Sequence, residues 1–325
     1  MQLRGAFEAM MMDDDLADHT NRTTHIEDHH TADSGNLIDQ NHPVTIEGAN
    51  NNATNFNLHD VVESGDRRLE TLFPLPSTID EMKANMDPDV IARIERYKPV
   101  FSYDSPDGGG ITCFPAAAVS RWGHINKGIS SCVPGNMQPC VRRDFLKYSN
   151  TYHRWGRFKW SGNGLIYEVH MFSLYFEVDV APVCAGHRHD FENVLVIFRA
   201  GSPYKVAVSA HGEYIVKRWH EVPKHFGKNP KIVYHRGSWG FNTNGFRFAK
   251  KSTEHCSSIL KLAGQCWNTP PIVSWEYMKG SGGLNNAMLK NVFNKHDFGK
   301  ASAPFRSWVF KRDAGKIVVT NVSSF

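Results

Sequence analysis

The fold of this chain is decided by residues 186–198, which have the sequence GHRHDFENVLVIF. The apolar run at 194–198, VLVIF, is short, β-branched and aromatic, and such a run is typical of a buried strand rather than of a helix. Two histidines and two carboxylates come shortly before it. The sequence therefore predicts a polar cluster at the entrance to a buried β-strand.

The side chains of this cluster are expected to divide between the two faces of the strand. Successive side chains of an extended strand point to opposite faces. Asp190 and Glu192 therefore share one face, and His189 and Phe191 share the other. The alternation predicts that the two carboxylates point in the same direction.

A third carboxylate and an imidazole can join this pair. His187 reaches the carboxylates only if the backbone bends before Asp190, and Gly186 permits such a bend. Asp179 follows the strand-like run at 169–176 and would return to the cluster through a short connection. Three carboxylates and one imidazole suit a hard divalent cation, calcium or magnesium before manganese, rather than zinc. The same residues would also suit a solvated, salt-bridged strand end.

Short apolar segments bounded by turn residues recur along the rest of the chain. They lie at 165–176, 194–198, 205–209, 214–216, 231–234 and 272–275. Frequent short strands of this kind predict an antiparallel β-sandwich. Helical periodicity is present from Ser77 to Tyr97, before Pro99, and again at 284–296. We therefore expect an α+β, mainly β fold with an antiparallel β-sandwich core and flanking helices.

Charge and composition divide the chain. The first 66 residues hold 2 Lys or Arg and 13 Asp or Glu, whereas the whole chain has a net charge of +4. An acidic segment with few large apolar residues cannot offset its ordering entropy, so residues 1–70 are predicted to be a disordered extension. Residues 71–310 would form the folded domain and 311–325 a C-terminal tail. The basic charges of the domain are scattered and no nucleic-acid motif is present, which argues against nucleic acid and for an anionic membrane surface as a partner.

The segment 186–192 carries a family resemblance. GHRHDFE resembles the GHRHDWE signature of the necrosis- and ethylene-inducing-peptide-like proteins, secreted microbial proteins best known from plant pathogens. Upstream, VHMFSLYFEVD at 169–179 resembles that family's AIMYSWYFPKD. Downstream, SAHGEY at 209–214 resembles its SxHGxY segment, and DFGKASAPF at 297–305 its DFGxAxxPF. Lys98-Pro99 and CFPAAAV at 113–119 are similar to its opening segment, so the resemblance covers residues 90–306.

This resemblance implies a metal centre and a toxin. The ligands of a calcium or magnesium ion, with manganese as a further option, would be Asp179, His187, Asp190 and Glu192, while Arg188 and His189 would orient them. In the family such a centre engages the sugar headgroup of plant glycosyl inositol phosphoryl ceramide sphingolipids, and damage to the membrane follows. The headgroup contacts would include His211, Trp239 and Asn242. The resemblance implies a monomeric cytolysin and virulence effector rather than an enzyme.

Two alternatives remain open. A metal-dependent hydrolase could use the same ion to activate water, with Glu192 or His189 moving protons. A relative without toxicity could keep the fold and bind a glycan or another surface. The second alternative is favoured by departures from the family pattern, among them Phe191 in place of tryptophan and the altered segment around Trp239.

Six cysteines without CxxC spacing indicate disulfides in a secreted protein, although no basic start and apolar run typical of a signal peptide is visible at the N-terminus. The resemblance implies a bridge between Cys113 and Cys132. Cys256 and Cys266 are close enough in sequence to close a small loop, which leaves Cys140 with Cys184. Buried free thiols are the alternative if the protein is cytosolic.

Overall fold

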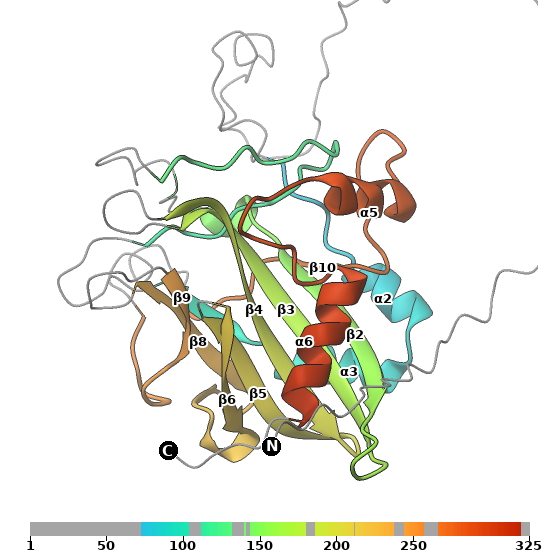
Figure 1. Ribbon diagram of the computed structural model, residues 1–325, viewed down its shortest axis with the longest axis vertical. Helices are drawn as coiled ribbons and strands as arrows, with labels where there is room; N and C mark the ends of the chain where they lie inside the picture. Colours follow the sequence, from blue (N-terminus) through green and yellow to red (C-terminus); the bar gives the residue numbers. More distant parts are fainter. Residues whose placement is uncertain are drawn as a thin grey trace, which may run out of the picture. The chain divides into compact units, whose positions relative to one another are not determined.

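The computed structural model describes residues 73–103, 112–131, 140, 144–179, 186–210, 212–236, 244–256 and 266–319 (Figure 1). These described residues all belong to one compact unit. Its long continuous segment starts at Arg67. The extension expected over residues 1–70 lies outside the described residues. In the described part of the chain, no helix is long and apolar enough to cross a membrane.

Ten strands form the sheet of this unit. They are β1 (Val100–Tyr103), β2 (Thr151–Lys159), β3 (Ile166–Asp179), β4 (His187–Arg199), β5 (Ser202–Ala210), β6 (Glu213–Arg218), β7 (Lys224–His225), β8 (Asn229–Arg236), β9 (Asn244–Phe248) and β10 (Ile272–Ser274). Their order is β1-β8-β9-β5-β4-β3-β2-β10, with β6 paired to β5 and β7 to β8. The mainly β fold is confirmed. The sheet is mixed, because β1 and β10, at its two edges, pair in parallel with β8 and β2.

The sheet curls so that its two halves face each other. The two halves are joined by the pair Ala210 and Gly245, between β5 and β9. A Cβ atom at residue 245 would lie 3.2 Å from the Cα of Ala210, so glycine allows the close approach at this corner. Beyond the corner, Phe176 of β3 stacks on Tyr234 of β8, with ring centroids 3.7 Å apart. This packing of one half on the other produces the sandwich that the sequence predicted.

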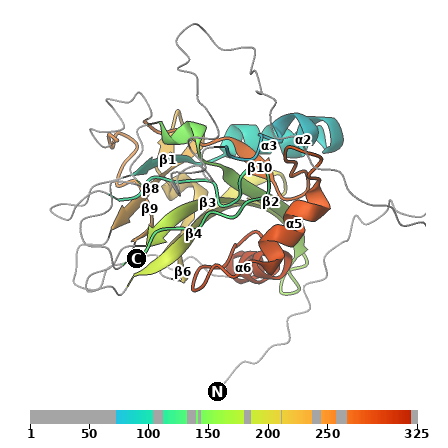
Figure 2. The same cartoon turned by 90° about the horizontal axis from the view of Figure 1, so that it is seen from above.

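The strand alternation of β3 and β4 creates two cores. Met171 and Leu195 belong to the core on one face, and Phe172 and Val196 to the core on the other. The helices in the described part of the chain are α2 (Ile79–Asn85), α3 (Pro88–Tyr97), α5 (Asn286–Lys295) and α6 (Ser307–Val319). The 3-10 turns there are η3 (Phe145–Lys147) and η5 (Trp219–Glu221). In Figure 2, α6 covers one face of β2, β3 and β4, while α2 and α3 cover the other. The helices therefore seal both cores.

The C-terminal helix corrects the domain boundary drawn from the sequence. A tail was expected from residue 311, but α6 continues to Val319. Phe310, Ala314 and Ile317 recur at intervals of four and three residues and are buried in the core. The folded domain therefore includes residues 311–319, and 320–325 lie outside the described residues.

The disulfides also correct the sequence analysis. Cys113 is bonded to Cys140, with 4.9 Å between their Cα atoms, and not to Cys132. The backbone N–H of Phe114 donates to the carbonyl of Cys140 at 2.9 Å, so the chain itself brings residue 140 beside residue 113. This bond also excludes the expected Cys140–Cys184 pair, and Cys132 and Cys184 lie outside the described residues. The Cys256–Cys266 bridge is confirmed.

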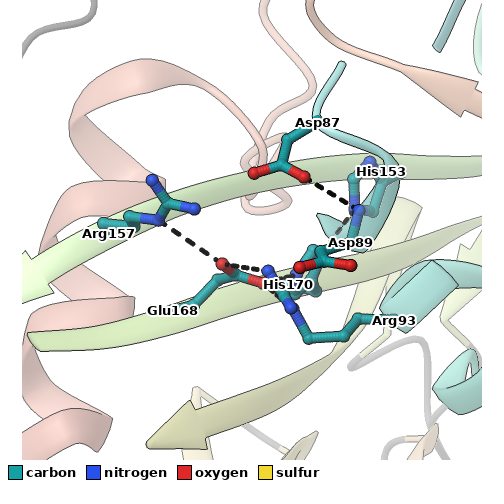
Figure 3. Close-up of polar contacts among 7 residues, drawn as sticks. All are labelled: Asp87, Asp89, Arg93, His153, Arg157, Glu168 and His170. Atoms are coloured by element: carbon teal, nitrogen blue, oxygen red, sulfur yellow. Dashed lines mark hydrogen bonds and ion pairs between the residues drawn. The ribbon is translucent and has the colours of Figure 1, made fainter. Parts of the chain in front are cut away.

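A buried polar network joins α3 to the sheet (Figure 3). Arg93 binds both carboxylate oxygens of Glu168, at 2.5 and 2.9 Å. Glu168 in turn contacts Nε2 of His170 at 2.9 Å, and Nδ1 of His170 lies 3.2 Å from Nε2 of His153. Both imidazoles are almost completely buried. Burial lowers the pKa of His170, and burial together with His170 holds the pKa of His153 well below its usual range.

Because these two histidines are buried in their neutral form, we expect the free energy of unfolding to fall in acid. The unfolded chain takes up their protons near pH 6.5, whereas the folded chain keeps them neutral, so the free energy of unfolding falls as pH drops below about 6.5. Each buried histidine contributes a slope of up to about 1.4 kcal/mol per pH unit. Urea titrations from pH 8 to pH 5 measure this slope. We expect His153→Gln to flatten it and His220→Gln, at an exposed position, to leave it unchanged; an unchanged slope in His153→Gln would contradict the assignment.

Candidate functional site

The predicted ligands come together where β3 ends and β4 begins. In the register of these strands, Asp179 lies opposite His187, Phe176 opposite Asp190 and Leu174 opposite Glu192. Asp190 and Glu192 therefore project from the same face of β4. Their side chains point towards β8 and β5, into the corner where the two halves of the sheet meet. The shared face of the two carboxylates is confirmed.

Asp179 and His187 form one side of the site. The Asp179 carboxylate accepts the backbone N–H of Asn244 at 2.8 Å, and its other oxygen lies 3.4 Å from Nε2 of His187. Nδ1 of His187 lies 2.8 Å from the carbonyl oxygen of His189, which can only accept, so Nδ1 carries a proton. In the neutral ring Nε2 is then an acceptor that faces a carboxylate. A proton or a cation between Nε2 of His187 and the Asp179 carboxylate oxygen would stabilise their contact.

Asp190 and Glu192 form the other side. Both carboxylates are buried, with 7% and 5% of their residue surfaces exposed. The hydroxyl of Tyr234, on β8, donates to Asp190 at 3.1 Å, and the hydroxyl of Ser209, on β5, donates to Glu192. Asp190 also accepts a hydrogen bond from the backbone of Phe191, so both carboxylates are oriented by neutral donors. Among the described residues, no Lys, Arg or His side chain forms an ion pair with either of these two carboxylates.

The electrostatics of the site favour a bound positive charge. Burial, and then the neighbouring Asp179 carboxylate, raise the pKa of Asp190 to about 8. Burial and the charge of Asp190 also raise the pKa of Glu192 well above its usual range, although the Ser209 hydroxyl opposes this effect. Carboxylates that are buried together without a counter-charge resist ionisation. A divalent cation would remove this penalty.

The bend that brings His187 to the carboxylates lies at His189, and not at Gly186 as the sequence suggested. His189 has a φ of 65°, a left-handed conformation that is uncommon outside glycine. Its ring is held on the opposite face of β4, where the Tyr175 hydroxyl is hydrogen-bonded to Nδ1 at 2.7 Å and Phe298 packs edge-on against the imidazole. Burial lowers the pKa of His189 to about 4. These contacts hold the local turn that the site needs.

The donor set fits a hard divalent cation. It offers three carboxylates and one imidazole nitrogen, which suit calcium or magnesium. In addition, both polar atoms of the Asn244 side chain are buried without a hydrogen-bond partner in the described part of the chain. Within that part, no three His, Cys, Asp or Glu side chains form a ready-made metal cage. The four side chains are neighbours that would have to draw together around an ion.

The structure brings together Asp179, His187, Asp190 and Glu192, with His189 and Arg188 between them on β4. His211, Trp239 and Asn242 lie outside the described residues, so their expected headgroup contacts stay predictions. Sequence reasoning missed the roles of Ser209, Tyr234 and Asn244. Ser209 was available within the recognised segment 209–214, but Tyr234 and Asn244 come from strands whose pairing with the site has no local signal.

Comparisons with known proteins identify a family and a fold. A family model described as "Necrosis inducing protein (NPP1)" matches residues 92–316. A solved structure described as "Toxin fold for microbial attack and plant defense" is 21% identical, with a TM-score of 0.55 over 78% of this chain and 98% of that chain. The structure "NLPPya in complex with glucosamine" is 21% identical, with a TM-score of 0.53 over 78% of this chain and 96% of that chain.

A third solved structure, "Crystal structure of non-toxic HaNLP3 protein", is 19% identical, with a TM-score of 0.52 over 79% of this chain and 100% of that chain. No curated protein matches the sequence. At these identities the structural likeness establishes the fold, and this fold is shared by structures described as toxins and by one described as non-toxic.

Proposed function

Because the chain belongs to the necrosis-inducing protein family, we propose that it is a secreted toxin that recognises plant membrane sphingolipid through a divalent cation and damages the membrane. The recognised group is the sugar headgroup of glycosyl inositol phosphoryl ceramide. Asp179, Asp190 and Glu192 would supply the negative charge that holds the cation, and His187 would complete the ligand set. The proposal is one of binding rather than catalysis.

The observation that supports this proposal is the buried carboxylate cluster at the corner of the sheet. Three carboxylates lie within a site that has only neutral hydrogen-bond donors for Asp190 and Glu192. A bound Ca²⁺ or Mg²⁺ would exchange its water ligands for sugar hydroxyl oxygens. The protein orients the carboxylates. It also keeps His187 turned towards them through the hydrogen bond between Nδ1 of His187 and the His189 carbonyl.

A sugar is the favoured ligand class because a solved relative of this fold is described in complex with glucosamine and another structure with mannosamine. Catalysis is disfavoured by the position of His189. Its ring faces Tyr175 and Phe298, on the side of β4 away from the carboxylates, and so cannot exchange protons with a water held beside them.

The test is dye release from vesicles that contain plant glycosylated sphingolipid. We expect the native protein to release dye in calcium or magnesium but not in a chelator, and vesicles of phosphatidylcholine alone to stay intact. Glu192→Gln removes one negative charge at nearly constant shape, and should abolish release, whereas Glu213→Gln, an exposed carboxylate, should retain it.

Three other outcomes would change the assignment. Cation-dependent binding to the sphingolipid without dye release would identify a family member that recognises the glycan but is not cytolytic. If a folded, cation-loaded protein neither bound nor permeabilised these vesicles, the proposed function would be wrong. Hydrolysis of a model phosphodiester that Glu192→Gln abolishes would favour the enzyme instead.

A further inference from the structure

The tip of the β7–β8 hairpin carries an exposed aromatic side chain in an unfavourable backbone conformation. Phe226 is 84% exposed, more than any other large apolar residue in the described part of the chain. It has a φ of 48° and is followed by Gly227 with a φ of 72°. The backbone N–H of Lys228 donates to the carbonyl of His225 at 3.1 Å and closes the turn. Two successive positive φ angles are typical of turns that prefer Asn-Gly, and a bulky side chain is disfavoured there.

Folding alone does not explain the phenylalanine at position 226, because Asn would adopt this turn conformation at a lower cost. Its ring contacts only that of His225, with 4.0 Å between centroids, among the ring contacts of the described residues. A large apolar side chain that is both exposed and conformationally disfavoured indicates a surface that binds something.

The surroundings of the tip are basic. Lys228 is exposed on the hairpin itself, and the backbone N–H of Lys224 donates to Ser252 at 3.3 Å. This contact places the turn that contains the exposed Lys250 and Lys251 beside the hairpin. Glu254, the nearby acid, is neutralised by Arg247 at 2.9 Å. Lys228, Lys250 and Lys251 are thus exposed on the hairpin and on the turn beside it, whereas the Lys224 ammonium is engaged by the Val222 carbonyl and the Trp219 ring.

The hairpin tip is separate from the cation site. Strand β8 runs from Asn229, beside the tip, to Arg236, which pairs with Asn244 at the site. Eight residues of strand span about 23 Å, so the two sites lie at opposite ends of β8. Figure 1 likewise shows η5, which precedes this hairpin, at the lower end of the sheet and the start of β4 at the upper end. Phe226 cannot contact a headgroup held at the cation site.

We propose that this hairpin tip, with Phe226 at its apex and the exposed Lys228, Lys250 and Lys251 beside it, docks on an anionic lipid surface independently of the cation. The aromatic ring enters the headgroup region while the lysines face lipid phosphates and carboxylates, a combination that strengthens interfacial binding. A lipid surface fits better than a protein partner because the tip is a single convex apolar point. Among the described residues, the other exposed large apolar side chains belong to other segments, so Phe226 has no apolar neighbour on its own hairpin to form the core of a protein interface.

The experiment is co-sedimentation of the full chain with phosphatidylcholine vesicles that contain phosphatidylserine, without glycosylated lipid and in a chelator. Without a cation or a glycosylated lipid, the proposed toxin site has no ligand. The lipid-docking proposal can therefore fail independently of the proposed toxin function. We expect binding that weakens with salt and with the omission of phosphatidylserine. Phe226→Ser should weaken it at least about tenfold, Phe226→Trp should restore it, and Lys228→Glu with Lys250→Glu should abolish it.

Trp308→Ser is the matched control, since Trp308 is also exposed, at 60%, but lies on α6. It should bind as the native protein does, and all variants should keep the native melting temperature because these side chains are exposed. Equal binding of Phe226→Ser and the native protein would overturn the proposal. So would binding that ignores the lipid charge, or a protein ligand whose affinity depends on Phe226 while vesicle binding does not.

Discussion

An Asp190→Asn variant is expected to bind Ca²⁺ or Mg²⁺ at least about 100-fold more weakly than the native protein, a loss of about 2.7 kcal/mol. Asp190 lies between the other carboxylates on the face of β4 that points into the corner of the sheet. Replacing it by an amide keeps the shape and removes one of three negative charges. Isothermal titration calorimetry measures the affinity, and the heat should disappear at cation concentrations that saturate the native protein.

The variant should still fold. Burial and the neighbouring Asp179 carboxylate raise the pKa of Asp190, so a neutral amide is tolerated at this buried position when no cation is bound. We expect the cation to raise the melting temperature of the native protein, because a ligand that binds only the folded state stabilises it. This rise should be absent in Asp190→Asn and intact in Glu213→Gln. Equal cation affinity of the native protein and Asp190→Asn would remove Asp190 from the ligand set.

A Phe298→Ala variant is expected to lose about 3–5 kcal/mol of unfolding free energy, the range for deleting a buried aromatic ring. Phe298 is 1% exposed and packs edge-on against both His189 and Phe191, with centroids 5.4 and 5.1 Å away. These two residues alternate with the candidate ligands along β4. The cavity should therefore destabilise the fold and also loosen the turn at His189 that positions His187.

Guanidinium denaturation measures the first effect, and cation affinity at a temperature where the variant is folded measures the second. Phe226→Ala is the matched control, because it removes the same ring from an exposed position and should change stability by no more than about 0.5 kcal/mol. A loss below about 1 kcal/mol in Phe298→Ala would show that the ring does not support β4.

The sequence by itself determined the local features of the site. The period of two along β4 placed Asp190 and Glu192 on one face and His189 and Phe191 on the other, as the structure shows. The helix at 286–295 and the Cys256–Cys266 bridge were also predictable, because each depends on residues close together in the chain. Such features depend on local geometry, which the order of side chains fixes.

The tertiary structure decided which distant segments complete the site. Asn244 reaches Asp179, and Tyr234 reaches Asp190, only because the sheet curls at Ala210 and Gly245 and brings β8 and β9 against β3 and β4. The Cys113–Cys140 bridge and the packing of α6 onto the sheet likewise join segments that are far apart in the chain. The free energy of these contacts comes from burying both partners together, and neither partner carries a sequence period that identifies the other. The electrostatic state of the carboxylates, which depends on this shared burial, was therefore set by the fold and not by their spacing in the sequence.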